Sequence, residues 1–193
     1  MKVVSVSGSP RGNVGKKDAK HLRREGHIPC VIYGGSEQIN FFLPETSFKD
    51  IVYTPESCIV SLDIDGRKFE AILQDIQFHP VNDSILHADF LQIFPDRPVK
   101  IKIPVKLSGT SPGVLKGGKL HLKLRKLLVM GLPANLPDQI DVSISKLNIG
   151  DSFKVGQLVK PNLSFLDHPA SVVVLVKSTR AAAGAVDEED TED

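Results

Sequence analysis

The sequence predicts a mainly β protein with few helices. We expect a six-stranded antiparallel β-barrel at residues 1–94, a second β-rich domain at 95–180 and a disordered tail at 181–193. Three observations lead to this prediction. Apolar and polar residues alternate over short stretches that turn-forming residues separate. The run Phe94-Pro95-Asp96-Arg97-Pro98 interrupts this alternation and marks a boundary. The Ala-rich, acidic end of the chain has too few apolar side chains to offset the entropy of ordering it.

The first 94 residues contain the elements of a small closed barrel. The stretches with strand character are residues 2–7, 28–33, 38–43, 58–64, 67–77 and 85–93. A loop starts at Gly8, a helix covers 16–25 with Gly26 beyond its end, and a short helix follows Pro44. Asp65-Gly66 is a strong hairpin signal. Because short strands with exposed edges tend to aggregate, closure into a barrel is the favoured arrangement.

The second half shows a cleaner β pattern. Apolar residues from Val99 to Leu107 alternate with lysines and one proline, which gives a strand with one apolar and one cationic face. Residues 120–125 alternate in the same way, and the glycines at 113–118 indicate a loop between the two strands. Further strands are expected near 139–145 and 171–177.

Charge is distributed unevenly along the chain. Residues 1–94 contain 10 basic and 12 acidic side chains, residues 95–186 contain 14 and 5, and residues 187–193 contain six acids. Six of the first ten cations lie between Arg11 and Arg24, where Asp18 is the one acid. Local excesses of this kind indicate a polyanionic partner such as a nucleic acid.

The helix predicted at 16–25 would carry much of that positive charge on one face. Lys16, Lys20 and Arg23 share a face with Arg24 at its edge, while Ala19 and Leu22 lie on another. Such a helix can pack through its apolar side and present cations to phosphates. A merely solvated basic face is the alternative interpretation.

Several other classes of protein find no support in the sequence. No apolar run approaches the roughly 20 residues that cross a bilayer, and no secretory leader is evident, so we expect a cytoplasmic protein with no membrane partner. Cys30 and Cys58 are expected to be buried free thiols. The glycine-rich stretch before Lys17 lacks phosphate-loop spacing, and no nucleophile motif occurs. We therefore expect no enzyme, no cofactor and no small-molecule substrate.

Two polar motifs remain as candidate sites. His87-Ala88-Asp89 lies on a predicted strand, so both polar side chains share one side. They could form a metal site with His121 or His168, pair with each other, or bond to base edges of a nucleic acid. The run from Gln74 to Pro80 supplies directional donors and acceptors at a strand end; a solvated strand end is the alternative.

Three stretches in this order resemble one family. They are Gly15-Lys-Lys-Asp-Ala-Lys-His-Leu-Arg-Arg-Glu-Gly-His-Ile-Pro-Cys-Val-Ile-Tyr-Gly34, Gln74-Asp-Ile-Gln-Phe-His-Pro80 and Leu86-His-Ala-Asp-Phe90. They are similar to bacterial large-subunit ribosomal proteins of the L-twenty-five type, which bind 5S rRNA. The basic second domain and the acidic tail resemble the longer form, the general stress protein CTC.

The resemblance implies RNA binding at the loop E region of 5S rRNA, at the central protuberance of the large ribosomal subunit, and a structural role in translation. It implies that phosphates are neutralised by Arg11, Lys16, Lys20, Arg23 and Arg24. It also implies that the surface meeting the RNA groove contains Tyr33, Gln74, Gln77, His79, His87 and Asp89. Ala19 and Phe78 stand where relatives often carry polar or basic groups. The second domain could contact neighbouring rRNA or ribosomal proteins.

Two other functions remain as alternatives. One is a metal-dependent barrel enzyme that uses His87, Asp89 and a third histidine. The other is a stress-linked interaction module whose basic second domain binds something other than rRNA.

Overall fold

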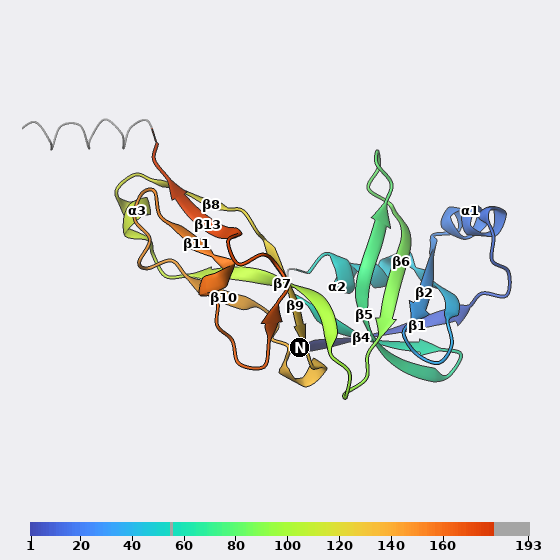
Figure 1. Ribbon diagram of the computed structural model, residues 1–193. Helices are drawn as coiled ribbons and strands as arrows, with labels where there is room; N and C mark the ends of the chain where they lie inside the picture. Colours follow the sequence, from blue (N-terminus) through green and yellow to red (C-terminus); the bar gives the residue numbers. More distant parts are fainter. Residues whose placement is uncertain (55, 180–193) are drawn as a thin grey trace, which may run out of the picture. The chain divides into compact units, whose positions relative to one another are not determined.

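The computed structural model describes residues 1–54 and 56–179 (Figure 1). The chain divides into two compact units. The first contains Met1–Ile101 and Leu132–Asp138, and the second contains Lys102–Gly131 and the chain from Gln139 onward. The tail predicted at 181–193 lies outside the described residues.

The first unit is built on a closed six-stranded barrel, as predicted. Its strands are β1 (Lys2–Pro10), β2 (His27–Tyr33), β3 (Ile39–Pro44), β4 (Cys58–Ile64), β5 (Arg67–Phe78) and β6 (Ile85–Gln92). They pair in the order β1-β3-β2-β6-β5-β4, and β1 closes the barrel against β4. The pairs β1–β4 and β2–β6 are parallel, so the barrel is mixed rather than antiparallel throughout. These strands are not consecutive in sequence, so no hairpin turn fixes their relative direction.

The barrel interior is filled by the apolar residues of each strand. In β4, Cys58, Val60, Leu62 and Ile64 are buried and alternate with half-buried residues, as their spacing predicts. Phe41 and Phe90 are fully buried with ring centroids 5.8 Å apart. Helices η1 (Glu45–Phe48) and α2 (Lys49–Val52) add Phe48 and Ile51 to this core.

Strand β1 continues through Gly8 to Pro10, where the sequence predicted a loop. A Cβ on Gly8 would lie 2.9 Å from the Phe41 side chain and 3.0 Å from that of Leu43. Glycine therefore lets β1 approach β3 closely at this point instead of ending the strand. The backbone of Arg11 then donates to the Asn40 carbonyl at 2.9 Å, which fixes where the following loop starts.

The second unit contains two small sheets. One has the order β10-β7-β9-β12 and the other β11-β13-β8. Their strands are β7 (Val99–Ser108, which begins in the first unit), β8 (Lys119–Leu122), β9 (Lys126–Gly131), β10 (Ile140–Ser143), β11 (Ser152–Lys154), β12 (Ser164–Phe165) and β13 (Val172–Lys177). The short helices are α3 (Pro112–Leu115), η2 (Pro133–Asn135) and η3 (Val155–Gln157).

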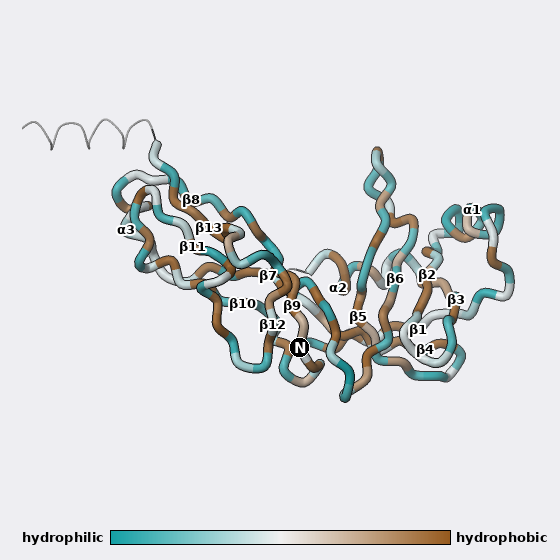
Figure 2. Tube along the Cα trace, in the orientation of Figure 1, coloured by the Kyte–Doolittle hydropathy of each residue, from teal (hydrophilic) through white to brown (hydrophobic). Residues whose placement is uncertain are grey.

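The structure corrects two details predicted for this half. The strand expected over 120–125 ends at Leu122, because the backbone N–H groups of Lys123 and Leu124 both donate to the Val173 carbonyl. The loop expected at 113–118 contains the single turn α3. Ser111, the buried residue before this turn, donates from its Oγ to the Leu147 carbonyl at 2.5 Å and so fixes the start of α3. Hydrophobic residues occur along the strands of both units (Figure 2). None of the helices in residues 1–54 and 56–179 has the length and apolar character of a membrane span.

Candidate nucleic-acid interface

Helix α1 (Lys16–Arg24) presents the cationic face that its spacing predicts. Lys16, Lys20, Arg23 and Arg24 are all exposed, while Ala19 and Leu22 are half-buried. The helix ends at Arg24, and Gly26 follows two residues later with a φ of 76°, a left-handed conformation that favours glycine. In Figure 2 this helix is predominantly hydrophilic.

A side-chain hydrogen bond attaches α1 to the barrel. The Nε of Arg23 donates to the Leu86 carbonyl of β6 at 2.8 Å. This bond leaves the two terminal nitrogens of the guanidinium for other acceptors. Arg23 therefore both positions the helix beside β6 and presents charge at the surface.

Arg11 differs from the other cations predicted to meet phosphates. Its Nη2 lies 2.5 Å from Asp18 Oδ2, its Nε also donates to that oxygen at 3.2 Å, and its side chain is only 7% exposed. Asp18 lies in the first turn of α1, so the pair fixes the loop before the helix. The structure thus places Arg11 in an internal ion pair, apart from the exposed cationic row.

Beside α1 lies a polar surface made by three adjacent strands, which we call the outer strand face and define as Tyr33, Asp75, Gln77, His87 and Asp89. Its position follows from strand alternation, since Ala88 and Phe90 point into the core and their neighbours must point outward. Cross-strand register pairs Gln77 with His87 and Asp75 with Asp89. Tyr33 lies on the adjacent β2, which runs parallel to β6.

Several side chains of the outer strand face interact electrostatically. His87 Nδ1 lies 2.6 Å from Asp89 Oδ1, so the predicted pairing of the two side chains is present. Burial raises the pKa of the Tyr33 phenol, and the carboxylates of Asp89 and Asp75 raise it further. Tyr33 therefore stays a hydrogen-bond donor at neutral pH, and the two carboxylates are acceptors.

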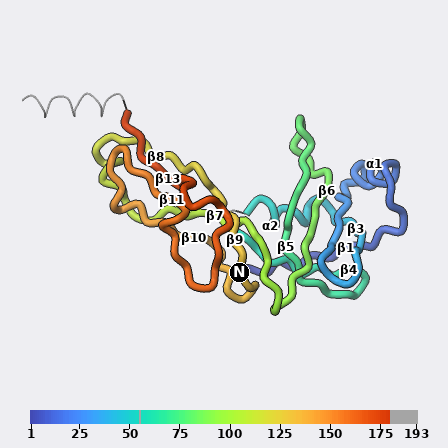
Figure 3. Tube along the Cα trace, in the orientation of Figure 1, coloured from blue at the N-terminus to red at the C-terminus, as the bar shows by residue number. Residues whose placement is uncertain are grey.

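Gln74 and His79 occupy different positions from the rest of the predicted set. The β5–β6 register shifts between Leu73 and Asp75, which makes exposed Gln74 the bulged residue. His79 lies in the turn that joins the two strands, where its Nδ1 accepts from the Val81 N–H at 3.3 Å. The β5–β6 hairpin and α1 project from the same end of the barrel (Figures 1 and 3). Exposed Phe78 and Val81 give the hairpin an apolar tip.

The structure thus brings most of the predicted residues together on one side of the first unit. Sequence reasoning left Asp75 out of this set, although it lies opposite Asp89. Counting cross-strand partners outward from the turn after His79 could have found it, but a register shift between Gln77 and Phe78 changes that count by one residue.

Of the three ligands that the alternative metal site would need, the structure brings two together, His87 and Asp89. In the part of the chain that the structure describes, no group of three or more His, Cys, Asp and Glu side chains is arranged to hold a metal ion. The thiols offer no reactive site either, because burial is the largest cause raising the pKa of Cys30 and of Cys58.

Comparisons with known proteins show the family to which the chain is similar. Residues 6–90 match the model of the Ribosomal L25p family, and residues 98–180 match that of the Ribosomal protein TL5, C-terminal domain. A protein of Amoebophilus asiaticus is 45% identical over 190 residues, covering 98% of this chain and 97% of its own. A protein of Cytophaga hutchinsonii is 43% identical and covers 94% of each chain. One from Porphyromonas gingivalis is 43% identical, covering 96% of this chain and 97% of its own.

All three relatives bear the name large ribosomal subunit protein bL25, which is the name of a ribosomal component and not of an enzyme. The identity extends over nearly the whole chain in each case. This chain therefore belongs to the ribosomal L25p family, in the longer form that carries a TL5-type C-terminal domain.

Proposed function

We propose that this protein is a structural, non-catalytic component of the large ribosomal subunit, and that it binds 5S rRNA at the loop E region of the central protuberance. The bound surface consists of α1 and the outer strand face. Membership of a ribosomal protein family supports the first part of the proposal. The protein acts in the cytoplasm, on the ribosome.

One observation carries the second part: a row of four exposed cations lies beside a face of directional donors and acceptors. Lys16, Lys20, Arg23 and Arg24 supply positive charge. The bond from Arg23 to the Leu86 carbonyl ties that charge to β6, the strand that carries His87 and Asp89. Cations next to fixed hydrogen-bonding groups are what an RNA helix with an irregular groove requires, because phosphates give affinity and base edges give specificity.

The shape of RNA explains why a flat strand face can take part. The minor groove of an RNA helix is wide and shallow, and it exposes 2′-hydroxyls and base edges. Side chains on a strand face reach such a groove without entering it deeply. Tyr33 would donate to a 2′-hydroxyl or base acceptor, and Gln77 both donates and accepts.

The carboxylates on this face give selectivity at the expense of attraction. Asp75 and Asp89 repel phosphates, but they accept hydrogen bonds from base amino groups. Because His87 is held against Asp89 at 2.6 Å, the carboxylate has a fixed direction before RNA arrives. An RNA that offers no amino group there would leave the carboxylate desolvated and unpaired, which costs affinity.

Arg11 takes a different role from the one that the resemblance implies. Its charge is already paired with Asp18, and its side chain is nearly buried. We propose that Arg11 positions the loop before α1, while the four exposed cations contact phosphates.

The division of the chain into two domains at residue 94 is also part of the proposal. Residues 1–94 contain the 5S rRNA site, and residues 95–180 contact neighbouring rRNA or protein.

A gel shift tests the proposal. The full chain is titrated into 5S rRNA and into a fully Watson–Crick duplex of equal length, each at two salt concentrations. We expect tighter binding to 5S rRNA at both, with affinity falling steeply with salt. Equal affinity for the two RNAs would refute specific recognition of 5S rRNA.

A further inference from the structure

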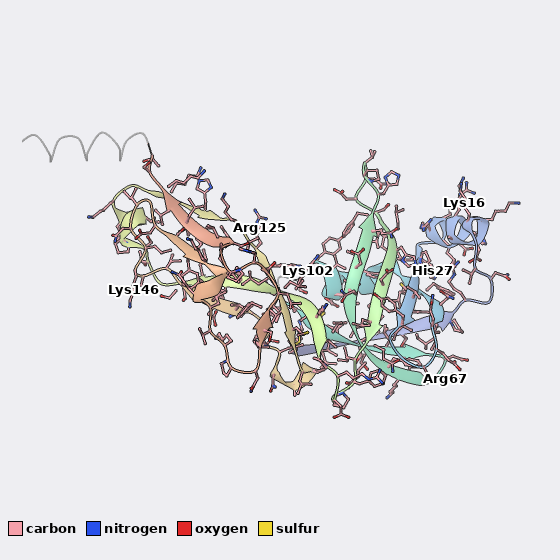
Figure 4. The ribbon with its side chains drawn as sticks, in the orientation of Figure 1. Lys16, His27, Arg67, Lys102, Arg125 and Lys146 are labelled. Atoms are coloured by element: carbon pink, nitrogen blue, oxygen red, sulfur yellow. The ribbon has the colours of Figure 1, made fainter. Side chains whose placement is uncertain are left out.

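A cavity of about 540 Å³ opens at the end of the barrel away from α1. It lies where β2 and β6 end and where β3 and β5 begin. Its lining includes Glu37, Arg67, Lys68, Gln92, Phe94 and Arg97. Figure 4 shows Arg67 and Lys16 at opposite ends of the first unit. This volume falls within the range of about 300–1,000 Å³ that small-ligand sites span.

Three cations and one carboxylate surround the cavity. Arg67, Lys68 and Arg97 are all exposed, and Glu37 is the acid among the lining residues. Within residues 1–54 and 56–179, none of the three cations takes part in an ion pair. Their charge is therefore available to an anion, in contrast to that of Arg11.

The cavity also has a planar surface held in place. The guanidinium carbon of Arg97 lies 5.0 Å from the centroid of the Phe94 ring. A turn fixes this stack, because the Arg97 N–H donates to the Phe94 carbonyl at 3.2 Å. Ile93, the residue before Phe94, donates to the Glu70 carbonyl of β5 at 2.9 Å. Unstacked RNA bases stack on such aromatic and guanidinium planes.

A hydrogen-bonding group completes the lining. The carboxamide of Gln92 lies where a Cβ on residue 35 would stand, so the absence of a side chain on Gly35 lets it pack there. An amide offers both donors and an acceptor, and the Glu37 carboxylate accepts. These are groups that bond to base edges.

From this combination we propose that the cavity binds one unpaired nucleotide of a second RNA segment. Arg67 and Lys68 contact its phosphates, the Phe94–Arg97 stack contacts its base, and Gln92 and Glu37 contact the base edge. The barrel then connects two RNA segments. Leu86, to which α1 is bonded, and Gln92 are six residues apart on β6, so the two sites are separated by about 20 Å. The cavity does not depend on the 5S rRNA contact proposed above.

Fluorescence anisotropy tests this proposal with the full chain. The probes are fluorescein-labelled ten-nucleotide single-stranded RNAs of uridine, adenosine or cytidine, added to protein alone and to protein saturated with unlabelled 5S rRNA. Nucleoside 5′-monophosphates are added as competitors, which separates a site for a free nucleotide from one that requires an RNA chain. A labelled peptide of six glutamates tests the other class of anionic partner.

The variants separate charge from stacking. Arg97→Lys keeps the cation but loses the planar group, and Phe94→Leu keeps an apolar side chain but loses the ring. The double change Arg67→Ala with Lys68→Ala removes two phosphate contacts. Lys49→Ala is the matched control, since Lys49 is an exposed cation of the first unit outside the cavity.

We expect at least one labelled RNA to bind with and without 5S rRNA. Arg97→Lys and Phe94→Leu should each weaken that binding by roughly fivefold or more, as the loss of base stacking does. The double change should lower the salt slope by about 1.4, or 0.7 per phosphate of a single strand. Lys49→Ala should change the affinity for the labelled RNA less than twofold. The cavity variants should change the affinity for 5S rRNA less than twofold.

The proposal is overturned if all cavity variants bind the labelled RNA as the unchanged protein does, or if Lys49→Ala weakens it equally. It is also overturned if the glutamate peptide binds the cavity and the RNA does not. Displacement of the labelled RNA by 5S rRNA would show one shared site instead of two. A variant with Lys16→Ala and Lys20→Ala separates the two proposals, because it should weaken 5S rRNA binding and leave binding at the cavity unchanged.

Discussion

Removing two cations from α1 should weaken 5S rRNA binding and reduce its salt dependence together. Lys16→Ala with Lys20→Ala removes two of the four cations proposed to contact phosphates and leaves the Arg23 bond to the Leu86 carbonyl in place. Alanine is a strong helix former, so the helix itself should persist. The change therefore tests charge apart from folding.

The expected size follows from the number of phosphates neutralised. Four contacts give a slope of log affinity against log salt of about −3.6, or roughly 150-fold weaker binding at 200 mM than at 50 mM salt. With two contacts, the slope becomes about −1.8 and the loss over the same range roughly 12-fold. Arg11 adds nothing to this count, because Asp18 already pairs with it.

Filter binding of 5S rRNA at four salt concentrations measures both slopes. The matched control is Lys2→Ala with Lys49→Ala, which removes two exposed cations of the first unit outside α1. The control should keep the slope of the unchanged protein. Equal slopes for the α1 variant and the unchanged protein would refute phosphate contact by this helix.

Three further outcomes are expected. Arg11→Ala should leave the salt slope of 5S rRNA binding unchanged. It should lower the free energy of unfolding by about 1–3 kcal/mol, as measured in urea, because it breaks the internal pair with Asp18. A lower slope would show that Arg11 contacts a phosphate. His87→Gln and Asp89→Asn should each reduce discrimination between 5S rRNA and a mismatched duplex, and a double-mutant cycle should give a coupling of about 0.5–3 kcal/mol because the side chains are 2.6 Å apart; additive effects would argue against a functional pair. Burial raises the Cys30 pKa, so its thiol stays neutral in the folded protein while the unfolded chain ionises above the ordinary value of 9.0. This contribution to stability is therefore full below pH 9.0 and declines above it, by about 1 kcal/mol up to pH 10; Cys30→Ala should show a flatter dependence in urea unfolding, and identical profiles would refute the effect.

The sequence predicted the local elements of the barrel well because each has a clear signal. The alternation in 58–64 matches β4, and the charge spacing in 16–25 matches α1. The parallel pairs β1–β4 and β2–β6 could not be predicted, since pairing between distant strands depends on tertiary packing. Gly8 shows the same limit. Its neighbours Phe41 and Leu43 decide that it continues a strand, and they come from more than thirty residues away.

The sequence likewise predicted some features of the candidate site and not others. Helical spacing identified the exposed cations, and strand alternation placed His87 and Asp89 on one face. The pairing of Arg11 with Asp18 was hidden, because charge counts do not show which cations are already neutralised. In the second unit, β11 and β12 have three and two residues, too few for a periodic signal.

Chemical footprinting of 5S rRNA bound to the full chain tests the central claim most directly. We expect protection of backbone and base positions in the loop E region. Lys16→Ala with Lys20→Ala should weaken the backbone protections, and Asp89→Asn should lose base protections while backbone protection remains. Protection elsewhere on 5S rRNA, or the same pattern in both variants as in the unchanged protein, would contradict recognition through α1 and the outer strand face.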